Sequence, residues 1–309
     1  MSETAWSAVA LVVVMGIAPA VTGVATRMRS ILTRRRGAPV FQLYADLLKL
    51  TRRGAVFSDT TTWIFRIAPV VIVATSLVAA TLVPLDGRSA LIRFPGDFVG
   101  LVYALALGRL FLVLAALDTG SCFEGMGASR EVTFASLVEI GLFLSFGALA
   151  VLTRELSLSG MLGSGLSRAM ASGNAAAVLM AAASLLVLLL AECARVPVDD
   201  PTTHLELTMI HEVMVLDHSG PDLALILYAN ALKLSVLGAV VVAALVPRAG
   251  MAPVLAIAVL AAGLVIVGAI VGIVEASMAR LRLSKVPLYL AGASSLALFS
   301  LILVLWNPA

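Results

Sequence analysis

Acidic and histidine side chains gather in one stretch of the sequence, ECARVPVDDPTTHLELTMIHEVMVLDHSGPD, which covers residues 192–222. It holds all 3 histidines and seven of the 18 acidic residues, but one basic residue, Arg195. Side chains of these types could relay protons, bind a metal or contact a charged partner. A metal is disfavoured, because His204 and His211 would lie about 10 Å apart along a helix, whereas metal pairs are usually spaced i,i+4. We expect these histidines on a solvated or partner-facing side, where their side chains can titrate near neutral pH.

The same stretch predicts a helix that starts after Asp200, which is a good N-cap and is followed by proline at the first helical position. The helical pattern continues to about Leu216. Glu206 falls in the middle of the apolar arc of this helix, so we expect it to be buried, with a raised pKa unless a cation meets it. The apolar arc consists of Leu205, Leu207, Met209, Ile210, Val213, Met214 and Leu216.

Four ionisable side chains lie within or at the ends of long apolar segments, where charge is costly and marks paired sites or pathways. Arg109 and Glu139 occupy consecutive antiparallel segments at depths of about 13 Å and about 12 Å, so they could meet. Lys233 lies about 16 Å deep in the sixth segment, and Glu192 closes the fifth. One interpretation is that Arg109 and Glu139 only neutralise each other and hold two helices in register. The alternative is that the four residues belong to a hydrated proton path.

The elements that position these groups follow from composition. Over 309 residues the chain is 61% hydrophobic and 13% charged, with a mean hydropathy of +1.07. Soluble proteins carry about 25% charged residues, so the chain belongs to the membrane class. Cys122 and Cys193 cannot supply the four thiolates of an iron–sulfur cluster. We expect no cofactor and no metal in this chain, no catalytic residues of its own, and no nucleic-acid partner.

Eight segments meet the requirement of about 20 mostly apolar residues for a transmembrane helix. They cover about residues 4–26, 63–84, 98–117, 132–152, 173–193, 222–246, 252–274 and 287–306. No hydrophilic domain is inserted between them. The sequence therefore predicts an all-α polytopic membrane protein, one integral membrane domain over residues 1–309, with short amphipathic helices in the cytoplasmic loops.

Basic residues are distributed unequally between the two sides of this predicted bundle. Fourteen of the 21 fall on the side of the acidic stretch and five on the other. The positive-inside rule makes the first side cytoplasmic and places both termini outside. Glu3 precedes the first apolar run and no basic region does, so we do not expect a cleavable signal. The predicted location is the bacterial cytoplasmic (inner) membrane.

Two further cytoplasmic segments carry charges that could contact a soluble partner. In PVFQLYADLLKLTRR (39–53), an apolar stripe lies opposite Asp46 and Lys49, which is typical of an interfacial helix, a docking surface or a cavity wall. In DTGSCFEGMGASREV (118–132), small residues separate Asp118, Glu124 and Arg130, and we expect a compact connector pressed against a partner. The stripe consists of Val40, Leu43, Leu47 and Leu50.

Three motifs together resemble the complex I H-subunit (subunit 1) family, and within it the membrane subunit of formate hydrogenlyase and related group 4 nickel–iron hydrogenases. RRGAPVFQLYADLLKL is similar to the family's motif after the first span, and ECARVPVDDP to its E-x-x-R-x-P-F-D-x-P. LDTGSCFEGMGASREVTFASLVE resembles the hydrogenase-type motif, with Arg130 and Glu139 at the family's Arg and Glu positions.

The resemblance implies a membrane-anchor and coupling subunit. It would connect a hydrophilic cytoplasmic arm, whose subunits carry iron–sulfur clusters and a nickel–iron site, to antiporter-like membrane subunits. Glu139 and Glu192 would belong to the proposed proton-translocation channel. Arg195, Asp199 and Glu206 would lie in the loop that faces the arm.

Quinone-reducing members carry an E-x-E-x-E cluster whose three positions here are Thr202, His204 and Glu206. This departure favours the hydrogenase-like branch over the quinone-site H-subunit of an NADH-quinone-type dehydrogenase, which is the first alternative. A stand-alone ion transporter is the alternative from another class, and would need a site at broken helices near the midplane.

Overall fold

The structure is a computed structural model that describes residues 3–200 and 209–306. Within these ranges it is helical without strands, and eight helices are long and apolar enough to cross a membrane. This confirms the predicted all-α polytopic fold. The eight are α1 (Glu3–Leu32), α3 (Trp63–Leu82), α4 (Asp97–Asp118), α5 (Cys122–Thr153), α8 (Ala175–Glu192), α9 (Gly220–Leu245), α10 (Pro253–Ser277) and α11 (Val286–Trp306).

Shorter helices occupy the connections. One of them, α2 (Gln42–Thr51), is the amphipathic helix expected within residues 39–53, and its apolar stripe is half-buried against α1 and α9. The others are α6 (Leu158–Gly160), α7 (Leu166–Ala171), the π-helix η1 (Met161–Gly165) and the 3-10 helices η2 (Glu212–Val215) and η3 (Leu283–Lys285).

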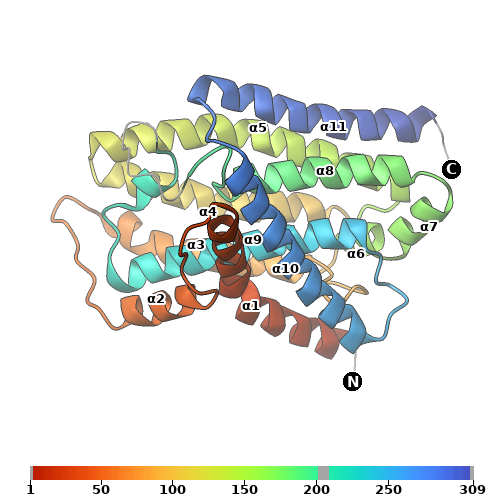
Figure 1. Cartoon of the computed structure of the whole chain (residues 1–309), viewed down its shortest axis with the longest axis horizontal. Helices are drawn as coiled ribbons and strands as arrows, with labels where there is room; N and C mark the ends of the chain where they lie inside the picture. The colour runs from red at the N-terminus through yellow and green to blue at the C-terminus, as the bar shows by residue number, and fades with distance from the viewer. Residues whose placement is uncertain (1–2, 201–208, 307–309) are drawn as a thin grey trace.

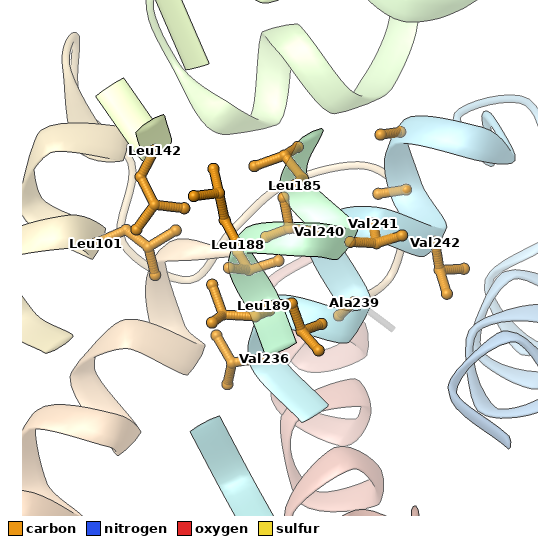
Figure 2. Close-up of a cluster of buried hydrophobic side chains, with 14 of the residues drawn as sticks. Leu101, Leu142, Leu185, Leu188, Leu189, Val236, Ala239, Val240, Val241 and Val242 are labelled. Atoms are coloured by element: carbon orange, nitrogen blue, oxygen red, sulfur yellow. The ribbon is translucent and has the colours of Figure 1, made fainter. Parts of the chain in front are cut away.

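Helix α9 is the most enclosed of the eight spans, with 72% of its apolar window buried. It contacts α1, α3, α8 and α10, while α5, α8 and α11 pack together along one side of the bundle (Figure 1). The core between α4, α5, α8 and α9 is aliphatic, as Figure 2 shows for Leu101, Leu142, Leu188 and Val240. A span surrounded by protein on all sides can carry polar groups at lower cost than one that faces lipid.

Helices α1 and α10 run side by side and cross the rest of the bundle obliquely (Figure 1). Their backbones approach closely at two glycines of α10. A Cβ at Gly268 would lie 2.7 Å from the Val21 carbonyl oxygen, and one at Gly272 would overlap the Ala25 carbonyl oxygen. Small residues that permit such approach are the usual means by which helices associate in lipid, where apolar burial gives no advantage.

The structure corrects the predicted connector at residues 118–132. Helix α5 begins at Cys122, ten residues before the predicted span, so only a short turn at Gly120 (φ 71°) separates it from α4. The reason is packing: the first turns of α5 lie against η2, and a Cβ at Gly127 would fall 2.9 Å from the Ile210 carbonyl oxygen. Gly127 therefore allows close contact with the acidic loop, and of the glycines in this segment only Gly120 lies in the turn.

The helix predicted from Asp200 to Leu216 is also corrected in its described part. Residues 209–211 are not helical, and only the four-residue 3-10 helix η2 follows. The apolar side chains of this part are buried, but Leu216 is 51% exposed. Backbone donors at 210 and 211 bond to the Asp199 carboxylate instead of to helical carbonyls, which favours a compact loop.

Candidate functional site

Arg109 lies at the centre of a buried cluster of charges at the end of the bundle that carries the acidic stretch. Its Nη2 is 3.2 Å from Glu192 Oε2 and 3.6 Å from Glu139 Oε1, and its Nε is 3.9 Å from Glu131 Oε1. Helices α4, α5 and α8 supply these groups. The contact between Arg109 and Glu139 expected from their equal depths is present, but Glu192 is the nearer partner.

Lys233 of α9 joins the same cluster through the second oxygen of the Glu192 carboxylate. Its Nζ lies 3.7 Å from Glu192 Oε1, so one carboxylate serves two cations. The Glu192 side chain is 2% exposed and that of Arg109 is 7% exposed. Two cations therefore face three carboxylates in this cluster, and a single proton on one carboxylate would make its net charge zero. Such a proton is shared by groups that compete for the same cations.

A small cavity of about 20 Å³ adjoins Arg109, Glu131 and Lys233. This volume suffices for a single water molecule, which needs two to four polar partners of the kind found here. His211 and Asn230 also line this cavity. Both residues line a second cavity of 410 Å³ as well, together with Asp46, Asp199 and other residues of the loop and of α1. The two residues thus stand in a wall common to both cavities.

The histidines do not behave as expected from the sequence. Asn230 Nδ2 lies 2.6 Å from His211 Nε2, and burial lowers the pKa of His211 to about 3, with further contributions from Lys233 and Arg195. His218 stacks on Phe65 at a ring distance of 4.0 Å, and burial lowers its pKa to about 4. The expectation of solvated histidines that titrate near neutral pH is wrong for both: His218 is buried, and the half-buried His211 ring is desolvated between the loop and α9. His204 lies outside the described residues.

Asp199 organises the loop above the cluster. It is 2% exposed, its Oδ2 accepts from the backbone nitrogens of Ile210 (3.2 Å) and His211 (2.9 Å), and its Oδ1 lies 3.0 Å from Arg280 Nη2. Burial raises the pKa of this carboxyl. Asp199 was expected to contact a cytoplasmic arm, but its side chain faces inward and holds the loop to the bundle.

Three other docking candidates likewise have partners within the chain. Asp118 Oδ2 accepts from Thr62 N (2.7 Å) and caps the start of α3. Glu124 is 1% exposed, and its Oε1 accepts from Asp217 N (3.3 Å). Arg130 Nη1 donates to the Met209 carbonyl oxygen at 3.0 Å. These contacts fix the ends of helices and the acidic loop, and leave open the prediction that the same face binds a partner.

The remaining predicted residues divide between the surface and the cavities. Lys49 is exposed, whereas Asp46 lines the 410 Å³ cavity. Arg195 lines the same cavity, and its Nη1 lies 3.3 Å from Glu275 Oε1. Glu206 lies outside the described residues. In the described ranges no group of three or more His, Cys, Asp or Glu side chains is arranged to hold a metal.

Sequence reasoning missed several members of this assembly. Glu131 stands one residue before the apolar segment predicted over 132–152, because an apolar window ends where charge begins. The extended α5 brings it to Arg109. Glu275 stands one residue beyond the apolar segment predicted over 252–274, opposite the basic Arg195. Asn230 gave no signal, since an amide in an apolar span has no preferred partner in sequence.

Glu139 and Arg109 are the members of the cluster that also line a groove at the side of the bundle. The Glu139 side chain is 30% exposed, and it lines this groove of 230 Å³ between α4 and α5 with Leu110 and Val132. Leu110 is 50% exposed and Val132 is 54% exposed. The cluster therefore connects, within the described residues, to the loop cavities on one side and to a lateral apolar groove on the other.

These features define a multi-pass membrane protein with a buried charged cluster at one end. A family model described as NADH dehydrogenase matches residues 5–306. The chain belongs to this family, that of the complex I H-subunit, as its motifs predict.

Among curated proteins, the chain is 32% identical over 236 residues to hydrogenase-4 component C of Escherichia coli K12, covering 76% of this chain and 73% of that one. It is 36% identical over 147 residues to formate hydrogenlyase subunit 4 of the same organism, covering 48% of each. It is 29% identical over 134 residues to the H-subunit of NADH-quinone oxidoreductase from Paraburkholderia xenovorans, covering 41% of this chain and 36% of that one.

Among solved structures, the membrane-bound sulfane sulfur reductase, an archaeal respiratory membrane complex, contains a chain with a TM-score of 0.79. Its sequence is 19% identical, and the match covers 96% of this chain and 97% of that one. The likeness establishes a shared fold. The relatives are subunits of multisubunit membrane complexes, so partner subunits are expected for this chain.

Proposed function

We propose that this chain is the membrane-anchor and coupling subunit of a hydrogenase- or formate hydrogenlyase-like, complex I-related oxidoreductase. It links electron transfer in a cytoplasmic arm to translocation of protons or sodium ions. The observation that carries the proposal is the cluster of Arg109, Glu131, Glu139, Glu192 and Lys233, which lies beneath the loop most similar to the family's motif. The family and the two Escherichia coli relatives support the same role.

The charge balance of the cluster supports a proton-carrying function over a purely structural one. A structural ion pair needs one anion for each cation, whereas here three carboxylates share two cations. Desolvation makes an uncompensated charge costly, and a single proton on one carboxylate would remove that charge from the cluster. Rearrangement of the shared cations between carboxylates would release or take up that proton.

The placement of the cavities supports the choice of partners. The loop face carries the acidic stretch and most of the basic residues, and there we place the hydrophilic subunits with their iron–sulfur clusters and nickel–iron site. The lateral groove beside Glu139 is apolar and suits a neighbouring antiporter-like membrane subunit. By the positive-inside rule the loop face is cytoplasmic, the termini are outside, and the location is the bacterial inner membrane.

The test uses the whole complex in sealed vesicles, with electron transfer and proton movement measured in the same sample. Glu139→Gln is the informative change, because Arg109 keeps Glu131 and Glu192 as partners and the fold is preserved. We expect proton movement per electron to fall about tenfold or more, as for loss of a proton-transferring group. Glu155→Gln is the control: this partly exposed glutamate follows the end of α5 opposite to Glu131, lies between α5 and α6, and pairs with Arg168. Unchanged proton movement in Glu139→Gln would refute the proposal.

A second function, quinone reduction, is favoured by the 410 Å³ cavity. Its volume lies in the range of small-molecule sites, and its lining combines Leu43 and Leu227 with Asp46 and Arg195. Extraction of the purified complex decides between the two: a stoichiometric bound quinone, or inhibition by quinone-site ligands, would support this second function.

A further inference from the structure

A cavity of 500 Å³ opens beside the last turns of α1, near the end of α10. Its lining includes Arg29, Arg35, Arg36 and Arg195, with Glu275 as the one acidic side chain. We call it the arginine pocket. Four guanidinium groups around one cavity are unusual in a chain with 13% charged residues, and the coupling role does not account for them.

Two of the four arginines already have carboxylate partners. Arg195 pairs with Glu275 at 3.3 Å, and Arg29 donates from both terminal nitrogens to Asp200, at 3.1 Å and 3.2 Å. Arg35 and Arg36 are exposed and have no ion pair within 4.0 Å in the part of the chain that the structure describes. The pocket therefore has an excess of two positive charges directed at one cavity.

The segment that carries these two arginines is held in a defined shape. Arg34 adopts a left-handed conformation (φ 54°), and the backbone nitrogen of Arg35 donates to the Ser30 carbonyl oxygen at 2.9 Å. Arg27 Nη1 then donates to the Gly37 carbonyl oxygen at 3.2 Å. Glycine is required at 37, because a Cβ there would overlap the Ser30 hydroxyl. The turn thus folds back over α1 and fixes the backbone on both sides of Arg35 and Arg36.

The pocket stands at the edge of the apolar surface. The membrane-spanning segment of α1 covers Thr4–Leu32, and its last two residues, Ile31 and Leu32, are 56% and 51% exposed. The guanidinium groups of residues 35 and 36 follow within one turn of chain. Neither Ile31 nor Leu32 lines the pocket, whose lining is polar, but the end of an apolar span beside an excess of arginine charge matches the order of acyl chain and headgroup in a phospholipid.

From this juxtaposition we propose that the arginine pocket binds the phosphate headgroup of an anionic phospholipid from the adjacent leaflet. Arg35 and Arg36 supply bidentate donors to the phosphate oxygens, a geometry for which guanidinium is suited. Basic pockets between spans on the cytoplasmic side bind anionic headgroups in this way. The already paired Arg29 and Arg195 form the rigid wall against which the headgroup rests.

The test compares two arginine pairs in the complex purified in mild detergent. The Arg35→Gln/Arg36→Gln variant removes the excess charge of the pocket. The Arg52→Gln/Arg53→Gln variant is the matched control, since both of its arginines are exposed, adjacent in sequence and on the same side. Bound lipid is measured by mass spectrometry after titration with phosphatidylglycerol, with phosphatidylcholine as the neutral probe.

We expect the pocket variant to bind phosphatidylglycerol about tenfold more weakly, with at least one fewer anionic lipid retained per complex, and the control variant to bind as the parent does. Arg35→Lys/Arg36→Lys should recover part of the affinity, because lysine keeps the positive charge. Recovery should be incomplete, because lysine lacks the bidentate donor geometry of guanidinium. Equal lipid binding by the pocket variant would overturn the proposal. Full competition by millimolar inorganic phosphate would also overturn it, because the pocket would then bind a soluble anion. Loss of a soluble subunit from the variant with lipid binding unchanged would likewise overturn it, because the arginines would then contact a protein.

Discussion

Asn230 of α9 and His211 of the acidic loop are joined by a contact of 2.6 Å between the amide nitrogen and Nε2. An amide nitrogen only donates, so Nε2 accepts and the imidazole carries its proton on Nδ1. Because both residues line both cavities, this neutral pair stands between the charged cluster and the larger cavity of the loop. The imidazole there is a neutral donor and acceptor and not a permanent charge.

His211 should therefore stay neutral throughout the pH range in which the protein is stable. Burial lowers its pKa to about 3, far below the ordinary 6.5, so no protonation is expected between pH 5 and pH 8. Nitrogen-15 NMR of histidine-labelled protein measures this directly, with His211→Gln to assign the resonance. We expect the Nδ1–H tautomer and a flat titration; an imidazole that protonates near pH 6.5 would contradict the described burial.

His218 should make the stability depend on pH. Its pKa is about 4 in the folded state against 6.5 in the unfolded state, so the unfolded chain binds the proton more readily. Stability is then complete above pH 6.5 and falls as the pH decreases towards 4, the sign given by proton linkage. Thermal unfolding at pH 7 and at pH 5 measures the difference.

His218→Phe is the variant that isolates this effect. In the described part of the structure neither ring nitrogen of His218 has a hydrogen-bond partner, and the ring stacks on Phe65. Phenylalanine keeps the stack and removes two unsatisfied polar atoms, so stability at pH 7 should be equal or higher. The loss of stability between pH 7 and pH 5 should become smaller; an unchanged loss would show that other groups cause it.

Glu192→Gln should destabilise the chain more than Glu131→Gln or Glu139→Gln. Glu192 is the only carboxylate within 4.0 Å of Lys233 among the described residues, whereas Arg109 also has Glu131 and Glu139. Removing one partner of a buried pair costs about 3–5 kcal/mol, because the other charge stays buried. Denaturant unfolding in detergent is the measurement.

The double variant Glu192→Gln/Lys233→Met provides the control for that prediction. It removes the uncompensated ammonium together with its partner, so stability should recover in part relative to Glu192→Gln alone. If the two variants are equally stable, then Lys233 does not depend on Glu192 for its charge balance.

Gly272→Ala should weaken the packing of α1 against α10. The added methyl group would overlap the Ala25 carbonyl oxygen, and forcing such a contact apart typically costs about 1–3 kcal/mol. Gly292→Ala in α11 is the matched control, because a Cβ there meets nothing within 4 Å. The apparent melting temperature in detergent should fall for the first variant and hold or rise slightly for the second.

The number and type of the spans could be predicted from the sequence because they depend on local hydropathy, which the chain carries in uninterrupted runs. The start of α5 could not. Its first turns hold Glu124 and small residues, which locally favour a connector, and they become helical only because η2 packs on them. The same contact explains why the acidic stretch is not the long helix that its periodicity indicates.

Contacts of the candidate site could be predicted where two charged residues lie at the same depth in neighbouring helices. They could not be predicted where one partner belongs to a loop. Arg109 and Glu139 could be matched by counting residues along antiparallel helices. Asp199 and His211 could not be placed, because their environment is made by segments far apart in sequence, such as Arg280 and Asn230. The family resemblance placed Asp199 in the loop that faces the arm but could not show that its side chain is buried, where backbone donors and Arg280 offset the cost of burial.

Between the cluster and the opposite ends of its four helices, residues 98–108, 140–153, 175–191 and 234–245 include no acidic or basic side chain, and Asp97 stands at the far end of α4. These four stretches therefore offer no side-chain charge or titratable carboxylate along which an ion could move. A membrane potential of 100 mV does about 2.3 kcal/mol of work on one elementary charge that crosses it fully. Under the proposed role, an ion that enters the cluster and leaves sideways at Glu139 crosses little of that voltage within this chain. The work against the potential is then done in the neighbouring subunit, and this chain acts as the contact that passes it the charge.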